Sequence, residues 1–371
     1  MTTPNSANFK FSFPAIRGIQ AGREYYVTMC PLGLVPKLLR LDDERLLPEH
    51  RAQRILNKGR LPQIIQYILK NPANYVLSSL TASVDGEVQF EPCAGDGTGR
   101  KLGMLIVPMD ARVLINDGQH RMAAIEGALQ KKPSLANEAI SIVLFVDAGL
   151  DRSQQMFADL NRFPVRPTRS LGILYDHRDP TAKLARKLAE TVPVFKGMTE
   201  AARSAISNRS RKLFTLSSIY QATRRFLSKK TGDDISPAEE RLATEFWVEV
   251  AKQVPDWRAA VDQKVHSSEL RRDYIHAHGI ALQAFAIAGA SLVTARPRTW
   301  QKELAKLKKV DWSRQKADLW EGRALIGGRL NKAQNNVILT ANVLKNTLGL
   351  SLSPTEIKVE RLYEQGRHNA R

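Results

Sequence analysis

Residues 111–124 read ARVLINDGQHRMAA and change from one type of secondary structure to another within a few positions. The aliphatic residues up to Asn116 are typical of a strand, and the Asp117-Gly118 pair is a turn signal. From Gln119 onward the residues favour a helix, and small alanines would let that helix lie close against a sheet. The stretch therefore predicts a strand that passes through a tight glycine turn directly into a helix.

This turn has the chemistry of an anion site. The first backbone N–H groups of a helix have no intrahelical acceptor and carry about half a positive charge, and phosphate groups bind there. Gly118 permits the left-handed backbone of a tight turn. Gln119, His120 and Arg121 add donors, and Arg121 can hold two phosphate oxygens at once. From the spacing alone, a capped strand–turn–helix with surface His and Arg side chains fits equally well.

Asp117 does not fit a simple phosphate site, because its carboxylate repels phosphate. Three roles remain open from the sequence. The side chain caps the helix, holds Mg²⁺ against a nucleotide, or orients His120.

Around the turn, the first 170 residues mix strand and helix signals. Residues 91–103 contain four glycines and predict a loop. The continuous apolar run at residues 139–146 predicts a strand covered on both faces. Helices are predicted at 48–69 (with a break near 59–62), 119–129 and 152–162, and strands at 24–29, 75–77, 80–84, 88–90, 111–116 and 139–146.

Beyond about residue 170 the pattern changes to long helical periodicities with few strand signals. We therefore predict an α/β (or α+β) N-terminal domain, residues 1–170, followed by a mainly helical C-terminal domain, residues 171–371. The C-terminal helices are predicted at 181–191, 213–227, 237–254, 274–292 and 331–348.

The charge balance indicates an anionic partner. The chain has 56 Lys and Arg residues against 37 Asp and Glu, a net charge of +19 and a pI near 10.0. Such an excess attracts polyanions, nucleic acid above all, and speeds their encounter with the protein; a basic surface that only keeps the protein soluble is the alternative. Binding to an anionic membrane would call for a basic amphipathic helix or a lipidation signal, and residues 1–5 offer neither.

Cysteine and histidine usage argues against metal and disulfide chemistry. Cys30 and Cys93 are too few and too isolated for a metal cluster or a disulfide framework. His276 and His278 stand at i and i+2, so their imidazoles would not converge on a helix. No apolar stretch approaches the length of a membrane span. We therefore expect a cytoplasmic protein with no metal site of its own.

Basic residues flank a predicted apolar helix in the C-terminal half. Such side chains suit contacts to the phosphate backbone, which position a protein on DNA without reading its sequence. A solvated basic face is the alternative. The candidate DNA-binding residues are Arg203, Arg209, Arg211 and Lys212 before the helix and Arg224 and Arg225 at its end.

The turn at residues 117–121, followed by Ala124, resembles the signature of the DGQHR-domain family, which is similar to the ParB/sulfiredoxin superfamily. Residues 57–68 (NKGRLPQIIQYI) resemble the upstream helix of that family, and residues 157–162 (FADLNR) resemble its F-x-D-I-N element. Segments 210–220 and 278–280 resemble the DndB family of the DNA phosphorothioate modification gene cluster. Together these resemblances cover most of the chain.

The resemblance implies a ParB/sulfiredoxin-like fold for the N-terminal domain and a DNA-binding repressor of the modification operon. It also implies a turn that binds nucleotide phosphates, with ATP or CTP and Mg²⁺ as the expected ligands. Asp159 and Asn161 of the F-x-D-I-N element stand at i and i+2, so their side chains diverge on a helix. They reach one ligand only if the helix ends at these residues. The implied binding residues are Asp117, Gly118, Gln119, His120, Arg121, Asp159 and Asn161.

Two other functions remain open. In an enzyme, the turn would hydrolyse a nucleoside triphosphate, with Asp117, His120 and Arg121 as the candidate catalytic residues, His120 as acid–base group and Arg121 as phosphate clamp. In an adaptor, the chain would dock on other DNA-modification proteins. Related DGQHR proteins accompany other DNA modifications, such as deazaguanine insertion. A homodimer would suit a repressor that reads a palindromic operator.

Overall fold

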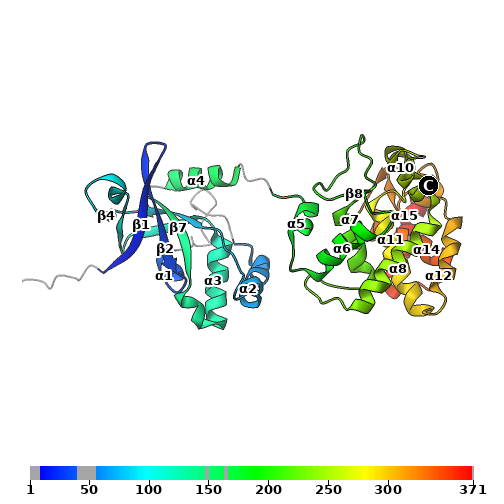
Figure 1. The fold of residues 1–371 in the computed structure, drawn as a ribbon, viewed down its shortest axis with the longest axis horizontal. Coiled ribbons are helices and arrows are strands. Elements are labelled where there is room, and N and C mark those ends of the chain that lie inside the picture. The colour runs from blue at the N-terminus through cyan, green and yellow to red at the C-terminus, as the bar shows by residue number, and fades with distance from the viewer. Residues whose placement is uncertain (1–8, 40–55, 147–149, 163–165, 370–371) are drawn as a thin grey trace, which may run out of the picture. The chain divides into compact units, whose positions relative to one another are not determined.

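The computed structural model describes residues 9–39, 56–146, 150–162 and 166–369, and these form two compact units. The first unit spans residues 1–165 and the second spans residues 166–371 (Figure 1). The predicted boundary after residue 170 falls inside helix α5 (Arg169–Tyr175), which belongs to the second unit.

The first unit is built on a seven-stranded sheet with the strand order β4-β5-β1-β2-β7-β3-β6. Neighbouring strands run antiparallel, except that β3 and β7 are parallel. The strand that leads into the predicted turn, β6, therefore lies at one edge of the sheet. The strands are β1 (Lys10–Gln20), β2 (Arg23–Pro31), β3 (Leu80–Asp85), β4 (Gln89–Pro92), β5 (Leu102–Pro108), β6 (Arg112–Asp117) and β7 (Ala139–Val146).

One apolar core joins the sheet to α1, α2, α3 and the turn η4 of the first unit. Helix α2 lies directly on α3, because a Cβ atom at Gly127 would come 2.6 Å from Cδ1 of Ile65. The helices and 3₁₀ turns are α1 (Val35–Leu38), η2 (Lys58–Arg60), α2 (Leu61–Lys70), η3 (Gly97–Arg100), α3 (Gln119–Lys131), η4 (Pro133–Asn137) and α4 (Leu150–Arg162).

Most predicted elements of the first unit are confirmed, with three corrections. Residues 75–77 are not a strand, and the predicted loop at 91–103 contains the end of β4 and the start of β5. Only alternate residues of β7 are fully buried, so its second face is partly open. Strands β1 and β5 were not predicted. Residues 48–55 of the predicted helix at 48–69 lie outside the described residues.

The second unit is mainly helical, which confirms the predicted fold class. Its core contains three fully buried tryptophans, Trp247, Trp257 and Trp320. Helix α11 packs between α7 and α14 and is apolar on nearly every side. The helices are α5, α6 (Pro180–Thr191), α7 (Leu216–Phe226), α8 (Pro237–Gln253), α9 (Pro255–Val261), α10 (Ser267–Asp273), α11 (Gly279–Ala295), α12 (Trp300–Glu303), α13 (Ala317–Trp320), α14 (Gln334–Leu348) and α15 (Pro354–Asn369), with the 3₁₀ turn η5 (Leu304–Lys309).

Short strands and side-chain caps set where several of these helices begin. The parallel pair β8 (Thr199–Glu200) and β9 (Phe214–Thr215) shortens the helix predicted from residue 213, so α7 starts at Leu216. The side chain of Thr215 then caps α7. Ser236 and Glu239 form a capping box at α8. A second small pair, β10 (Leu325–Ile326) and β11 (Arg329–Leu330), is antiparallel.

The described residues contain no helix with both the length and the apolar character that crossing a bilayer requires. Both cysteines are free thiols, Cys30 buried and Cys93 exposed. Burial raises the pKa of Cys30 to about 12, so this thiol stays protonated at neutral pH and is a poor nucleophile.

Candidate functional site

Strand β6 runs into α3 through Gly118, as the sequence predicts. Gly118 has a φ of 105°, a left-handed conformation that residues with a side chain rarely adopt. A Cβ atom at this position would also lie 2.5 Å from Cδ2 of Leu80. Both the backbone angle and the close approach of β3 therefore require glycine in the turn.

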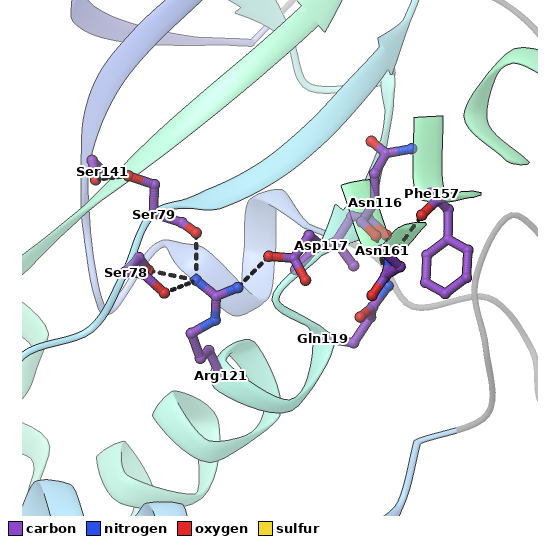
Figure 2. Close-up of polar contacts among 10 residues, drawn as sticks. Ser78, Ser79, Asn116, Asp117, Gln119, Arg121, Ser141, Phe157 and Asn161 are labelled. Atoms are coloured by element: carbon purple, nitrogen blue, oxygen red, sulfur yellow. Dashed lines mark hydrogen bonds and ion pairs between the residues drawn. The ribbon is translucent and has the colours of Figure 1, made fainter. Parts of the chain in front are cut away.

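The guanidinium of Arg121 is bound to the chain's own oxygens. Its Nη1 donates to the carbonyl (2.7 Å) and the hydroxyl (2.6 Å) of Ser78 and to the carbonyl of Ser79, and Nη2 pairs with the carboxylate of Asp117 (Figure 2). The side chain is 19% exposed. Arg121 therefore fastens the start of β3 to the end of β6, and a bidentate phosphate clamp would require these bonds to be exchanged.

Asp117 is not a helix cap, which settles one of its three proposed roles. The N-cap of α3 is Gly118, which has no side chain that could bond to the first turn of the helix. The Arg121 guanidinium compensates the charge of Asp117, so this carboxylate opposes a nearby anion less than an unpaired one would. Among the described residues, the backbone N–H groups of Gln119 and Arg121 have no side-chain cap, as the predicted anion site requires.

Gln119 faces inward and is 3% exposed. Its Nε2 donates to the carbonyls of Ile115 (3.3 Å) and Asn116 (3.1 Å), which closes the end of β6 (Figure 2). The prediction that its side chain binds phosphate does not match these surroundings, and only the backbone N–H of Gln119 remains for a ligand. Asn116 is fully buried, and within the described part of the chain its Oδ1 has no hydrogen-bond partner.

His120 joins the turn to the upstream motif. Its Nε2 accepts a hydrogen bond from the backbone N–H of Asn57 at 3.1 Å, so this nitrogen carries no proton in the bonded form. The side chain of Asn57 in turn caps η2 by accepting from the N–H of Gly59. Two segments that the sequence analysis singled out separately, residues 57–68 and the turn, are thus in direct contact.

Asp159 and Asn161 lie at exposed positions of α4, close to Arg162, the last residue of the helix that the structure describes. Asn161 donates to the carbonyl of Phe157 at 2.8 Å (Figure 2). Asp159 accepts from Gln155 at 2.8 Å. Across the described residues, no hydrogen bond or ion pair joins either side chain to the turn. The helix reaches the turn through its other end, where the carbonyl of Ser153 accepts from Asn116.

In the second unit, the predicted DNA-binding residues divide into two groups. Arg203, Arg209 and Arg211 are exposed on the segment 201–213, which we call the arginine loop and which connects β8 to β9. Within the described chain, the side chains of Arg203 and Arg209 have no hydrogen-bond or ion-pair partner, and Arg211 contacts only the amide of Gln263 at 3.3 Å. These three cations are available to an external anion.

The other three predicted residues hold the fold together. Lys212 donates to the carbonyl of Gly197 at 2.8 Å, and Arg224 donates to the carbonyl of Lys229 and lies over the ring of Tyr220. Arg225 bonds to two glutamines on α11 and α14, and burial lowers its pKa. The prediction that Lys212, Arg224 and Arg225 contact DNA does not match these internal roles.

A residue that the sequence analysis did not select organises the arginine loop. Arg271 on α10 is 8% exposed, and it donates to the loop carbonyls of Ser207, Ser210 and Lys212. Burial lowers its pKa. Arg271 gives no local signal in the sequence, because its partners are backbone atoms about sixty positions away.

The described residues contain no group of three His, Cys, Asp or Glu side chains placed to hold a metal ion. Nδ1 of His276 accepts from the indole of Trp257 at 3.2 Å, and its Nε2 lies 3.1 Å from the carboxylate of Asp256. This second bond lowers the pKa of Asp256. His278 instead contacts the carbonyl of Arg271 at 2.7 Å, so the two imidazoles serve separate packing sites.

Comparison with known proteins gives one family. The family model DndB, described as DNA-sulfur modification-associated, matches residues 13–351. The match includes the turn in the first unit and the arginine loop in the second. No curated protein and no solved structure matches the chain.

Proposed function

The chain belongs to the DndB family of DNA-sulfur modification-associated proteins, and from this we propose that it is a DNA-binding repressor of the operon that encodes a phosphorothioate modification system. In this role it acts in the cytoplasm, beside other proteins of the system. A homodimer would match a palindromic operator.

The observation that carries the proposal is the set of unpaired arginines on the arginine loop. Many other cations of the second unit are neutralised by carboxylates, as in the pairs Lys187–Glu240, Lys229–Glu239 and Arg296–Glu303. Arg203, Arg209 and Arg211 are exposed and have no such partner among the described residues. Uncompensated guanidinium groups on one loop favour contacts to the DNA phosphates.

The triple variant Arg203→Gln/Arg209→Gln/Arg211→Gln tests the loop directly. We expect its affinity for duplex DNA to fall about 10- to 100-fold at roughly 0.1 M salt, by a similar factor for every sequence, because phosphate contacts do not read bases. Fluorescence anisotropy with a labelled duplex from the promoter of the operon measures this loss. A scrambled duplex of the same length shows whether the loss depends on sequence.

The matched control removes the same charge elsewhere in the second unit. Arg241, Arg298 and Arg361 are exposed and lie away from the arginine loop in the sequence, and their replacement by glutamine lowers the net charge by the same amount. We expect this control to bind DNA nearly as well as the natural protein. An equal loss in both triple variants would mean that overall charge, not the loop, drives binding.

We also propose that the turn in the first unit binds the phosphates of a nucleoside triphosphate, ATP or CTP, and that this binding regulates the repressor. Two observations favour such a site: the start of α3 has no side-chain cap, and the Oδ1 atom of Asn116 beside it is buried without a partner among the described residues. The backbone N–H groups of Gln119 and Arg121 would hold the phosphates. Asp117 is the one carboxylate of the turn able to hold Mg²⁺, and hydrolysis of the nucleotide is the enzymatic alternative.

Titration calorimetry with ATP and CTP, each with and without Mg²⁺, tests this site. We expect Arg121→Ala to weaken nucleotide binding at least tenfold, because Arg121 holds the turn in shape through Ser78, Ser79 and Asp117. Loss of these bonds also lowers stability by about 1–3 kcal/mol, which thermal unfolding detects. Lys131→Ala, at the exposed far end of α3, is the control. If the natural protein binds neither nucleotide, the proposal is wrong.

A further inference from the structure

A cavity of about 550 Å³ opens in the second unit and shares a wall with the arginine loop. Loop residues 204–206 and 208 form one side, and β9 with the start of α7 forms another. Residues of α10 and the first residue of α11 complete the wall, together with Arg314 and Lys332. Small-molecule sites commonly have volumes of about 300–1,000 Å³, so the cavity has the size of a ligand site.

Four cationic side chains line this cavity, and no carboxylate does among the described residues. They are Arg271, Arg272, Arg314 and Lys332. Arg272 is paired with Asp273, which also interacts with the charge of Arg314. Arg271 bonds to backbone carbonyls, which leave its charge uncompensated. The ammonium of Lys332 has no hydrogen-bond or ion-pair partner in the described chain. The cavity therefore holds an excess of positive charge.

The pKa of His278 reflects the positive charge around the cavity. Burial, together with the charges of Lys332, Arg314 and Arg271, lowers its pKa to about 4, although the hydrogen bond to the Arg271 carbonyl opposes this shift. The imidazole is therefore neutral at pH 7. Since the Arg271 carbonyl can only accept, Nε2 carries the proton. Lys332 is an exposed residue by surface area, yet the surrounding protein lowers its pKa through desolvation.

The donors of the cavity converge at the start of α11. This helix spans Gly279–Ala295, and its N-cap His278 makes no side-chain bond to it. The N–H of Ala281 already donates to the His278 carbonyl at 3.0 Å, so the N–H groups of Gly279 and Ile280 are the ones that an anion would meet. A Cβ atom at Gly279 would lie 2.3 Å from the hydroxyl oxygen of Ser218 and 3.7 Å from Nζ of Lys332. Glycine is thus required for a hydroxyl, an ammonium and a helix N-terminus to meet at one point.

We propose that this cavity binds the phosphate group of a small phosphate monoester of nucleotide size. The start of α11, Ser218 and Lys332 hold the phosphate, and Arg314 adds charge. A bare phosphate would leave most of the cavity empty, so the apolar wall that includes Ile206, Leu213 and Phe214 takes the organic part of the ligand. This site is separate from the turn in the first unit and does not depend on nucleotide binding there.

A ligand in the cavity would also affect the arginine loop, the proposed DNA surface; this point rests on the proposed repressor function. Arg271 lines the cavity and binds three carbonyls of the arginine loop. A phosphate beside Arg271 would compete for its donors, so occupancy should change how the loop presents its arginines. The ligand would then act as an effector of DNA binding.

Calorimetry on the full chain with inorganic phosphate and with AMP tests the proposal. We expect both to bind, and Lys332→Gln to weaken both about tenfold or more, because a charge-assisted hydrogen bond is lost. Gly279→Ala should have the same effect without changing the charge, since the new methyl group pushes Ser218 away. Lys308→Gln, an exposed lysine outside the cavity wall, is the control and should bind normally. A bound phosphate should also raise the pKa of His278 in an NMR titration.

The alternatives give different results. Tighter binding of AMP than of phosphate supports the proposal, because the apolar wall then holds the organic part, whereas equal binding overturns the assignment of a nucleotide-sized ligand. The proposal is overturned if neither probe binds, or if Lys308→Gln weakens binding as much as Lys332→Gln. It is also overturned if Lys332→Gln weakens only duplex DNA, since the cavity would then be a contact for the DNA backbone. Phosphate binding by the arginine-loop triple variant separates this site from the proposed DNA surface.

Discussion

The affinity of this protein for duplex DNA is expected to fall by about 10³- to 10⁵-fold between roughly 50 and 200 mM salt if it contacts about six to ten phosphates. Each such contact releases counterions condensed on the DNA, so the logarithm of the binding constant falls with a slope of about 0.9 per contact. The arginine loop presents three unpaired arginines. A monomer that used only these would lose about 40-fold over the same range, whereas a homodimer with six contacts reaches about 10³-fold.

The slope therefore tests both the DNA surface and the number of chains on the duplex. Anisotropy titrations at four or five salt concentrations measure it. The arginine-loop triple variant should give a slope shallower by about 3 per chain, and the control variant at Arg241, Arg298 and Arg361 should not. A salt-independent affinity would rule out phosphate contacts as the source of binding. An unchanged slope in the loop variant would place the DNA surface elsewhere.

The fold was predictable where its signals are local. The strand, glycine turn and helix around Gly118 follow from consecutive residues, and the long helices of the second unit follow from their periodicity. Strands β1 and β5 were missed because each depends on a distant partner: Ala15 of β1 pairs with Gly103 of β5. Gly103 indicated a loop, yet a Cβ atom there would come 2.2 Å from the carbonyl oxygen of Glu91. This glycine lets β4 and β5 approach each other.

The candidate site was predictable in its residue types but not in their partners. Arg121 binds Ser78, which lies 43 positions away, and Arg225 binds Gln334 at a separation of 109. A sequence shows that an arginine is present, but the fold decides whether its donors meet the chain's own oxygens or remain free for an anion. The same holds for the cavity, since Lys332 and the start of α11 become neighbours only in the folded unit.

The buried ion pair between Lys345 on α14 and Glu356 on α15 gives the largest expected effect on stability. Nζ of Lys345 lies 2.7 Å from Oε1 of Glu356, and the two residues are 4% and 7% exposed. Lys345→Met fills a similar volume but leaves the carboxylate buried with only its bonds to Ser353. We expect the free energy of unfolding of the second unit to fall by about 3–5 kcal/mol. All five tryptophans lie at or beyond residue 247, so their fluorescence during denaturation reports on this unit alone.

The pH dependence of this loss identifies its cause. Burial raises the pKa of Glu356, but hydrogen bonds from Lys345 and Ser353 outweigh that effect and leave the pKa lowered. In the natural protein this carboxylate therefore stabilises the fold above its unfolded pKa, and the contribution is lost as the pH falls. In Lys345→Met burial dominates and raises the pKa of Glu356, so protonation removes the unpaired buried charge. The difference in the free energy of unfolding between the two proteins should therefore shrink from pH 7 towards pH 4.

Two further variants serve as controls. Adding Glu356→Gln to Lys345→Met should restore much of the stability at pH 7. Lys252→Met, which breaks an exposed pair with Glu249, should lower the free energy of unfolding by less than about 1 kcal/mol. A loss that is the same at every pH, and is not reduced by Glu356→Gln, would show that the methionine merely packs badly.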